Sequence, residues 1–499
     1  MIRSAFCSGW LVACTLVAVP ALAQPSADAA ASGVSLTFSP ESLGRALEGS
    51  AVERAVDGTQ EPEWAAEGRA CDGCPRRRVW APFVQSTIIN VFYNLGNKAR
   101  GEETAKVNPK TWWNNLKYGL EWDDNPFLVN QFGHPYQGNN YFTSGRANGL
   151  SFWESSAIAA FGSATWEYFG ENNYGSFNDL INTTLGGIAL GEMFHRTAWL
   201  IRDTTKNDRG RLWQEIAGTA LDPVGGYNRF VSGDASRISE KPDEFVPSTV
   251  AAYWQFGTLW QGDGDGEFSS NPKVFLEADL RYGDIRTGRS REPYEAFTVN
   301  LRLGGGKAIS DVRVRGRLLG QPLGEAGHVQ LTLAQSYDFI ANQAYEFGRQ
   351  GFDVTLSGRK QLSSRFAAQF IGGVGVTVLG AVDQVPIPTP FSADEAEEPG
   401  ERDYDYGPGT TFGAGTQFSF DGYTFANVSY QGYQIYVVDG LRSNHVLQRV
   451  RLDLLVPIRG RLAFGFAGEF FYRKTYFQAG GEKSSHYPQL RFFLTWRRS

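Results

Sequence analysis

The chain has 499 residues, a formal net charge of -6 and 42% hydrophobic residues. This length allows a large core, whereas the negative charge offers no basic surface for nucleic acid, so a DNA- or RNA-binding role is not expected. The 58 glycines, 35 phenylalanines, 21 tyrosines and 13 tryptophans, against two methionines, favour short strands and interfacial aromatic rings over helical bundles.

The start of the chain has the pattern of a signal peptide. Arg3 supplies the positive charge, residues 11–19 form an apolar run, and residues 21–23 (Ala-Leu-Ala) form a small-x-small cleavage site. We expect cleavage after this site and export across the inner membrane of a Gram-negative-type cell. A lipobox ending at Cys14 is the alternative, but the apolar run continues beyond that cysteine.

Residues 24–81 are predicted to form a flexible linker, because alanine, serine, glutamate and glycine dominate there without a sustained period. Cys71 and Cys74 are the cysteines that remain after the predicted cleavage, and in an oxidising compartment we expect them to form a small disulfide. Two functional alternatives need more than this pair. A thioredoxin-like redox motif needs a βαβ context, and a zinc site needs a second cysteine pair.

The stretch that follows the linker is predicted to be helical. Residues 150–170 and 180–201 form two mainly small and apolar segments, and Gly187 and Gly191 remove side chains from one face of the second. Such spacing lets two helix backbones approach closely, so we expect the two segments to pack against each other. Asp179 is predicted to cap the start of the second helix.

Three short motifs in this region carry a family resemblance. They are Asn-Gln-Phe-Gly-His-Pro-Tyr-Gln-Gly at 130–138, Trp166-Glu167-Tyr168, and Asn178-Asp179 followed by Gly186-Gly187 and Leu190-Gly191-Glu192. With these motifs, the chain from about Val107 to Arg202 resembles an uncharacterised bacterial family, domain of unknown function 3943. The resemblance implies no activity, because the family has none assigned.

Three ionisable residues, Glu167, Glu192 and His195, are predicted on otherwise apolar helices. Burying a carboxylate is costly unless it is paired, metal-bound or protonated, so each needs a partner. One hypothesis is a catalytic acid–base site or a metal site. Glu192 and His195 are three residues apart on one helical face, and His134 would complete the cluster.

A structural network is the alternative to that site. In it, Glu167 and Glu192 pair with Arg146 or Arg196, or accept hydrogen bonds from tryptophan and tyrosine. We expect the two carboxylates to face each other or a shared basic partner across two closely packed helices. The sequence has no Gly-x-Ser-x-Gly elbow, no His-Glu-x-x-His, no Walker loop and no dinucleotide fingerprint, and no cofactor is predicted.

From residue 245 to 499, about twelve segments alternate apolar and polar side chains with period two, clearly so at 274–281, 312–318 and 450–454. After the signal peptide, no run reaches the roughly 20 apolar residues that a spanning helix needs. Only helices and closed barrels satisfy the backbone in lipid. The predicted fold class is therefore mainly β: a transmembrane antiparallel β-barrel of about 12 strands, preceded by a small helical region over residues 82–235.

Connection lengths give a second indication of a barrel. The tight connections at 421–422 and 457–460 alternate with long ones at 379–409, 438–444 and 475–486, as expected for periplasmic turns and extracellular loops. A soluble periplasmic β-domain is the alternative, because three residues follow Trp496, where barrel proteins usually end on the aromatic residue itself.

The expected function is that of an outer-membrane protein of unassigned activity, with a structural, gating or partner-binding role and with the helical region below or partly within the barrel. Outer-membrane lipid and a periplasmic protein are the expected partners. One alternative is a lipid-modifying enzyme whose candidate site residues are Glu167, Glu192, His195 and His134. Another is a small-solute pore lined by Arg313, Arg315 and Arg317. His445 and His486 are expected to decorate the outer rim rather than to act as catalytic bases.

Overall fold

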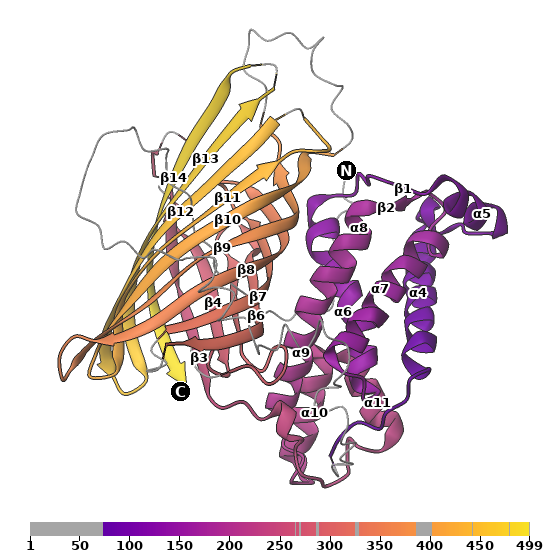
Figure 1. Ribbon diagram of the computed structural model, residues 1–499, viewed down its shortest axis with the longest axis horizontal. Coiled ribbons are helices and arrows are strands. Elements are labelled where there is room, and N and C mark those ends of the chain that lie inside the picture. Colours follow the sequence, from indigo (N-terminus) through magenta and orange to yellow (C-terminus); the bar gives the residue numbers. More distant parts are fainter. Residues whose placement is uncertain are drawn as a thin grey trace.

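The computed structural model describes residues 73–498, except for 265, 269–270, 286–288, 325–328, 386–401, 442 and 479. The predicted signal peptide, most of the predicted linker and Cys71 lie outside the described residues. Cys74 is disulfide-bonded, and its pairing with Cys71 stays a prediction. Figure 1 shows two parts side by side, a tilted barrel and a bundle of helices.

The bundle contains α4 (Ala81–Arg100), α5 (Pro109–Tyr118), α6 (His134–Ala147), α7 (Phe152–Phe169), α8 (Phe177–Ile181), α9 (Gly187–Ile201), α10 (Arg209–Leu221) and α11 (Pro223–Ser232). Two π-helical turns, Val129–Gly133 and Asn182–Gly186, directly precede α6 and α9. Two 3-10 turns, Glu103–Ala105 and Asp243–Phe245, lie in the connections. A two-residue parallel ladder joins β1 (Leu120–Glu121) to β2 (Gly175–Ser176).

The close helix pair of the bundle differs from the predicted one. A Cβ on Gly187 would lie 2.5 Å from the carbonyl carbon of Gly138, and one on Gly191 would lie 2.7 Å from the Phe142 ring. Both contacts belong to α6, so the small face of α9 receives α6 and not the segment 150–170. The prediction was wrong because α6 is rich in polar residues and did not show an apolar helical pattern, although its Gly138 permits the same close approach.

The barrel consists of β3 (Val250–Gln261), β4 (Lys273–Tyr282), β5 (Phe297–Gly304), β6 (Lys307–Leu323), β7 (Val329–Ala341), β8 (Glu346–Gln361), β9 (Phe366–Asp383), β10 (Tyr404–Phe420), β11 (Tyr423–Tyr436), β12 (Ser443–Arg459), β13 (Leu462–Phe477) and β14 (Glu482–Arg498). Each strand pairs antiparallel with the next one, and β14 pairs back onto β3 with Trp496 opposite Trp254. The predicted fold class is confirmed: a closed antiparallel barrel of twelve strands follows a helical region.

Short and long connections lie at opposite ends of the barrel only near the C-terminus. The two-residue turns after β10 and β12 lie at one end of the barrel, as predicted, but the β4–β5 connection at 283–296 lies at that same end and is long. The two-residue β5–β6 turn lies at the other end. The long connection predicted at 475–486 was wrong, because β13 continues to Phe477 and β14 begins at Glu482, with Tyr476 paired to Glu482. The β4–β5 connection is long because it reaches the bundle, where Tyr294 stacks on Phe152 of α7 with ring centroids 5.6 Å apart.

The alternation of side chains separates the two faces of the barrel wall. On β4, Val274 points outward and is 57% exposed, whereas Glu277 points into the lumen and is fully buried. On β6, Val312 and Val314 also point outward, yet they are buried. These two valines belong to one apolar core with Ile188, Met193 and Phe194 of α9 and with outward residues of β5, β7, β9 and β10.

The helical region therefore lies beside the barrel, against its outer wall (Figure 1). Polar contacts add to the apolar ones: the Tyr337 hydroxyl donates to the Gln131 carbonyl at 2.7 Å, and Gln335 donates to the Leu185 carbonyl at 2.9 Å. The expected position below or within the barrel was wrong. The outward wall of β4 to β10 offers the bundle an apolar surface, whereas charged side chains fill the lumen.

Among the helices of the described part, none has the length and apolar character needed to cross a membrane.

Candidate functional site

The structure separates the four predicted site residues into three groups. Glu192 and His195 lie on α9, three residues apart, but each contacts a different set of partners. His134 begins α6 and Glu167 lies near the end of α7, and these two belong to a third group. Glu167 and Glu192 do not share a partner, so the predicted seam between them does not form.

Glu192 is paired with two arginines. Its carboxylate accepts from the Arg146 Nε at 2.8 Å and from the Arg196 Nε at 2.7 Å, and all three side chains are buried. Burial alone raises the pKa of Glu192, but the two guanidinium groups outweigh it and hold the pKa below its usual value. Arg196 also donates to the carbonyl of Pro293 in the β4–β5 connection, so this group helps to tie α9 to the barrel.

His195 forms a second group with Asp222. The Nδ1 of His195 and the Oδ2 of Asp222 are 2.8 Å apart, and Asp222 also accepts from the backbone N–H of Gly225 at the start of α11. The Nε2 of His195 is buried and has no hydrogen-bond partner among the described residues. Burial lowers the pKa of His195, against the opposing effect of Asp222. A neutral ring that donates from Nδ1 to Asp222 would leave the Nε2 lone pair available.

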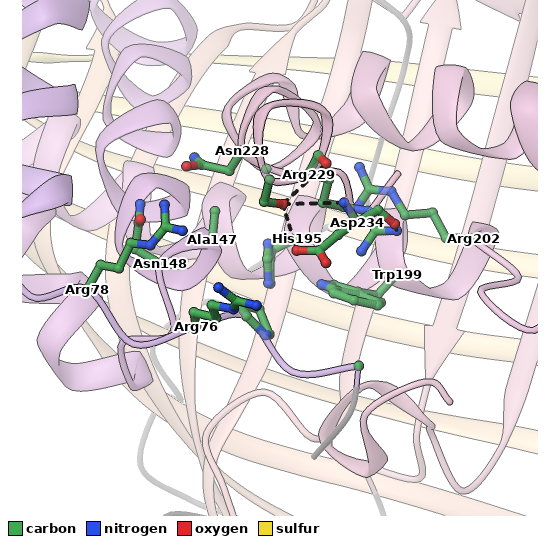
Figure 2. Close-up of a pocket in the computed structure, with 14 residues that line it drawn as sticks. Arg76, Arg78, Ala147, Asn148, His195, Trp199, Arg202, Asn228, Arg229 and Asp234 are labelled. Carbon is green, nitrogen blue, oxygen red and sulfur yellow. Dashed lines mark hydrogen bonds between the residues drawn. The ribbon is translucent and has the colours of Figure 1, made fainter. Parts of the chain in front are cut away.

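A small cavity of about 40 Å³ adjoins His195, as Figure 2 shows. Its lining includes four arginines and two asparagines: Arg76, Arg78, Arg202, Arg229, Asn148 and Asn228. Trp199 and Asp234 complete the part of the wall near the histidine. The arginines make the cavity suited to a small anionic group, such as a phosphate or a carboxylate. Sequence reasoning missed Asp222, although Asp222-Pro223 is a typical helix start and so offered a signal.

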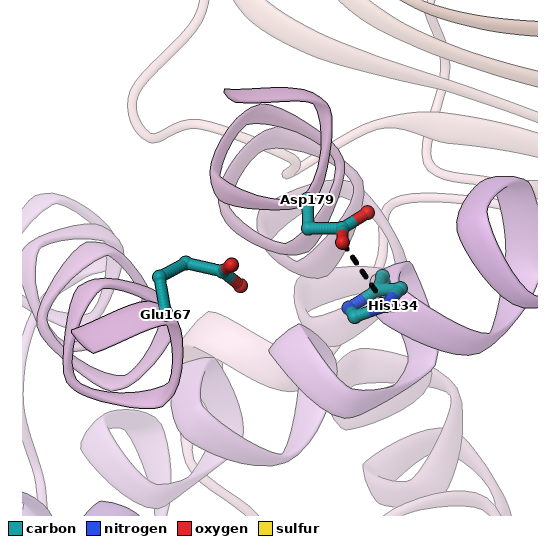
Figure 3. A group of neighbouring side chains, drawn as sticks. All are labelled: His134, Glu167 and Asp179. Atoms are coloured by element: carbon teal, nitrogen blue, oxygen red, sulfur yellow. Dashed lines mark ion pairs between the residues drawn. The ribbon is translucent and has the colours of Figure 1, made fainter. Parts of the chain in front are cut away.

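The third group consists of His134, Glu167 and Asp179, all buried (Figure 3). One possible ligand atom from each lies within 4.8 Å of the others, and the His134 Nε2 is 3.6 Å from the Asp179 Oδ2. The π-helical turns position two of them, because one turn ends directly before His134 and the other follows the short helix that carries Asp179. Such turns occur frequently at functional sites.

Hydrogen bonds hold one oxygen of the Glu167 carboxylate and both oxygens of the Asp179 carboxylate. The Glu167 Oε2 accepts from the backbone N–H of Ser176 at 2.8 Å, and the Ser176 hydroxyl donates to the Asp179 Oδ2 at 2.8 Å. Asn178 donates to the Asp179 Oδ1 at 2.8 Å. Asp179 thus accepts from two neighbouring side chains, and the residue at the N-cap of α8 is Ser176, so the predicted capping role of Asp179 was wrong.

The electrostatics of the third group oppose ionisation. Burial, and then the charge of Asp179, raise the pKa of Glu167 well above its usual value. Burial, and then Asp123, do the same for Asp179. Burial also raises the pKa of the neighbouring Glu171 to about 7, and burial lowers that of His134. In the described part of the chain, no arginine or lysine forms an ion pair with Glu167 or Asp179.

The predicted pore arginines are ion-paired inside the barrel. Arg313 pairs with Asp311 at 3.0 Å, and Arg315 pairs with Asp338 at 2.7 Å. Arg317 pairs with Glu295 of the β4–β5 connection.

The two predicted rim histidines differ from each other. His445 lies near the start of β12 as predicted, but it is buried and faces the lumen, where its Nε2 lies 2.8 Å from the Asp405 Oδ2 and its Nδ1 lies 3.0 Å from the Thr475 hydroxyl. The expectation that it decorates the outer rim was therefore wrong. His486 is exposed and stacks on Phe470.

The fold is a closed antiparallel barrel with a helical region attached to its side. Residues 119–224 match the family model for the domain of unknown function DUF3943, which confirms the resemblance predicted for this region. No curated protein matches the sequence.

Solved structures of outer-membrane barrels are similar to about half of the chain. A KdgM porin in complex with disordered oligogalacturonate is 8% identical, over 49% of this chain and 98% of that one, with a TM-score of 0.23. The NanC porin is 9% identical over 49% and 98%, with a TM-score of 0.26. The outer membrane protease OmpT from Escherichia coli is 10% identical over 50% and 97%, with a TM-score of 0.16.

Proposed function

We propose that the protein is an outer-membrane β-barrel that does not conduct solutes and that instead holds the helical region at its lipid-facing wall. The observation that carries this proposal is a layer of ion pairs across the lumen. A barrel whose lumen is filled by side chains serves as a scaffold, whereas a pore needs a continuous water-filled path.

The ion-pair layer links strands up to six places apart in the twelve-strand order, since Arg449 of β12 pairs with Asp311 of β6 at 3.2 Å. Glu277 of β4 pairs with Arg491 of β14 at 2.5 Å and with Arg451 of β12 at 3.2 Å. Glu469 of β13 pairs with Arg491 at 2.6 Å and with Arg302 of β5 at 2.9 Å. All of these side chains are buried. Buried charges are costly to desolvate, so each carboxylate is held by several guanidinium groups at once.

A cavity of about 540 Å³ lies on one side of this layer. It is near the tight turns at 421–422 and 460–461, and Glu277 and Arg451 of the layer are among its lining residues. We interpret this cavity as a vestibule that ends at the layer.

The distribution of side chains in the bundle favours contact with lipid. Large apolar side chains are exposed on α4, α5, α10 and α11: Val84, Ile88, Val91, Phe92, Leu95, Trp112, Trp113, Leu116, Leu212, Trp213, Ile216, Tyr227, Phe230 and Val231. The interior of the bundle instead buries asparagines, histidines and ion pairs. Soluble domains usually show the opposite arrangement, and large exposed apolar patches mark membrane or protein contacts.

The apolar exterior of the barrel continues this surface. Where the bundle does not cover it, the outer wall exposes residues such as Val376 on β9, Leu454 on β12 and Leu494 on β14. We therefore propose that outer-membrane lipid surrounds both parts and that the outer membrane is the location of the protein. The protein should fractionate with outer membranes and should run faster unboiled than boiled on a mildly denaturing gel, and recovery as a soluble monomer would contradict the proposal.

Conductance in planar lipid bilayers tests the closed lumen. The wild-type protein should give no steady conductance. Replacing both Glu277 and Glu469 with alanine removes the carboxylates that pair with Arg302 and the closest partners of Arg491, and it leaves Arg451 with Asp453 alone. The uncompensated arginines should repel each other, take up water and open an ion path. Asp421→Ala is the matched control, because it removes an exposed ion pair with Arg365 outside the layer. Steady conductance of the wild type at the level of the double variant would overturn the proposal.

A second candidate function is acid–base catalysis on a small anionic group of a lipid. The Nδ1 of His195 is oriented by Asp222, its Nε2 is available, and arginines line the adjoining cavity. Mass spectrometry of outer-membrane lipids should then differ between cells that carry the wild type and cells that carry His195→Ala, with the exposed His486→Ala as the control. Identical lipid profiles in all three strains would exclude this candidate.

A further inference from the structure

His134, Glu167 and Asp179 form a buried acidic group that lacks the basic partners found elsewhere in the bundle. Glu192 pairs with Arg146 and Arg196, and Glu215 pairs with three arginines. Glu167 and Asp179 instead accept hydrogen bonds from Ser176 and Asn178, which are neutral. Two ionised carboxylates in such a place need a positive charge, and His134 is the basic side chain that the described structure places beside them.

One atom of this group is unsatisfied and directed at the other two residues. The Glu167 Oε1 is buried and has no hydrogen-bond partner among the described residues, and Figure 3 shows the Glu167 carboxylate pointing toward Asp179 and His134. The Glu167 side chain is 4% exposed, so bulk water does not compensate for the missing partner. A buried acceptor without a partner is unfavourable, and a bound cation would supply the missing partner.

The remaining contacts orient three donor atoms toward the same space. The backbone of Ser176 holds the Oε2 of Glu167, which leaves the Oε1 available. The hydroxyl of Thr183 lies 3.2 Å from the Nδ1 of His134, which leaves the Nε2 facing the Asp179 Oδ2 at 3.6 Å. Outer hydrogen bonds of this kind fix the orientation of metal ligands in proteins.

We propose that His134 Nε2, Glu167 Oε1 and Asp179 Oδ2 bind a divalent transition-metal ion, for which Zn²⁺ is the probe of choice. Ligand atoms about 2.0–2.2 Å from Zn²⁺ lie roughly 3–4 Å from one another. The distance between the His134 Nε2 and the Asp179 Oδ2 already meets this condition. One ligand atom from each of the three residues lies within 4.8 Å of the others, so a small movement of the side chains brings all three to zinc-binding distance. The imidazole favours Zn²⁺ over Mg²⁺ and Ca²⁺, which prefer oxygen ligands alone.

Three protein ligands are the number found in catalytic zinc sites, which keep a fourth position for water or substrate. The site lies in the bundle, whereas the ion-pair layer lies in the barrel lumen, and the site shares no residue with the His195 group. The inference therefore goes beyond the proposed scaffold function and does not depend on it: a conducting barrel could bind the ion, and a closed barrel could lack it.

Metal content of the purified full-length protein tests the site. After treatment with a chelator, dialysis against Zn²⁺ and removal of free ion, the wild type should retain about one Zn²⁺ per chain. Loss of an outer hydrogen bond at a metal site costs about 10–100-fold in affinity, so loss of a ligand in Glu167→Gln or Asp179→Asn should cost at least about tenfold. Glu103→Gln, at an exposed ion pair with Lys106, is the matched control and should bind as the wild type does.

A second measurement uses the wild type alone, in case the variants do not fold. Co²⁺ bound by nitrogen and oxygen ligands in place of Zn²⁺ should give visible absorption bands that disappear when Zn²⁺ is added. Absence of stoichiometric Zn²⁺ in the wild type, or Zn²⁺ retention by both ligand variants equal to that of the control, would overturn the proposal. In either case the buried carboxyl groups would be a protonated structural cluster.

Discussion

Glu154 shows how one side chain makes two contacts at the start of a helix. Its carboxylate accepts from the backbone N–H of Ser151 at 2.8 Å, while the Ser151 hydroxyl accepts from the backbone N–H of Glu154, a reciprocal capping box at the start of α7. The same carboxylate is 2.6 Å from the Arg77 guanidinium. Hydrogen bonding to Arg77, against a smaller effect of burial, lowers the pKa of Glu154 to about 2.

This lowered pKa predicts a pH-dependent contribution to stability. Because the folded-state pKa lies below the ordinary value of 4.5, ionised Glu154 stabilises the fold above pH 4.5, and this contribution is lost as the pH falls toward 2. The site is partly exposed, so Glu154→Gln should lower the free energy of unfolding by only about 0.5–1 kcal/mol at pH 7. Denaturant unfolding followed by tryptophan fluorescence should show this difference shrinking between pH 4.5 and 2. A difference that is constant over this range would contradict the assignment.

The buried ionisable residues show what the sequence could predict at this scale. The pattern of carboxylates on apolar helices indicated that Glu167 and Glu192 need partners, and Arg146 and Arg196 were named as possible partners. The division into separate groups could not be predicted. It depends on α6 lying between α7 and α9 and on α11 bringing Asp222 to His195, and both are contacts between residues distant in sequence.

At the scale of elements, the glycines of α6 and α9 decide how the bundle packs. A Cβ on Gly138 would lie 1.8 Å from the carbonyl oxygen of Thr183, which is backbone and cannot move aside cheaply. Overpacking of this kind typically costs about 1–3 kcal/mol. Gly96 of α4 differs, because a Cβ there would meet nothing within 4 Å.

This contrast predicts opposite effects of the same substitution. Gly138→Ala should destabilise the bundle by at least about 1–3 kcal/mol, whereas Gly96→Ala should stabilise it by roughly 0.5–1 kcal/mol, because alanine loses less backbone entropy in a helix. Protease resistance of the helical region at increasing denaturant concentration measures both. Equal resistance of the two variants would show that α6 and α9 are not in close contact.

The elements themselves were predictable to different degrees. The barrel strands were predictable from the sequence because each strand has one inward and one outward face, which gives its side chains a period of two, as at 274–281. The helix α6 was not, since its buried residues are mostly polar, among them Gln137, Asn139, Asn140 and Arg146. Hydrophobic periodicity cannot identify a helix whose buried face is polar.

At the scale of the whole molecule, the arrangement of the two parts explains why some outward residues are buried. The alternation on β6 predicts an outward apolar face, and the structure shows that the bundle, rather than lipid, covers that face at Val312 and Val314. Periodicity does not distinguish these two environments, because both are apolar. The lateral position of the bundle is therefore the central feature that sequence reasoning did not provide.

A disulfide cross-link in the full-length protein, formed without prior denaturation, tests this lateral position most directly. A Cβ on Gly348 of β8 would lie 2.7 Å from the Cγ of Gln131, so cysteines at these two positions are close enough to bridge. The double variant Gln131→Cys/Gly348→Cys should form the cross-link, detected by mass spectrometry of the digested protein. The control pairs Gln131→Cys with Phe464→Cys on the uncovered wall of β13 and should not cross-link. No cross-link in the first variant, or equal cross-linking in both, would contradict the docking of the helical region on the outer wall of β4 to β10.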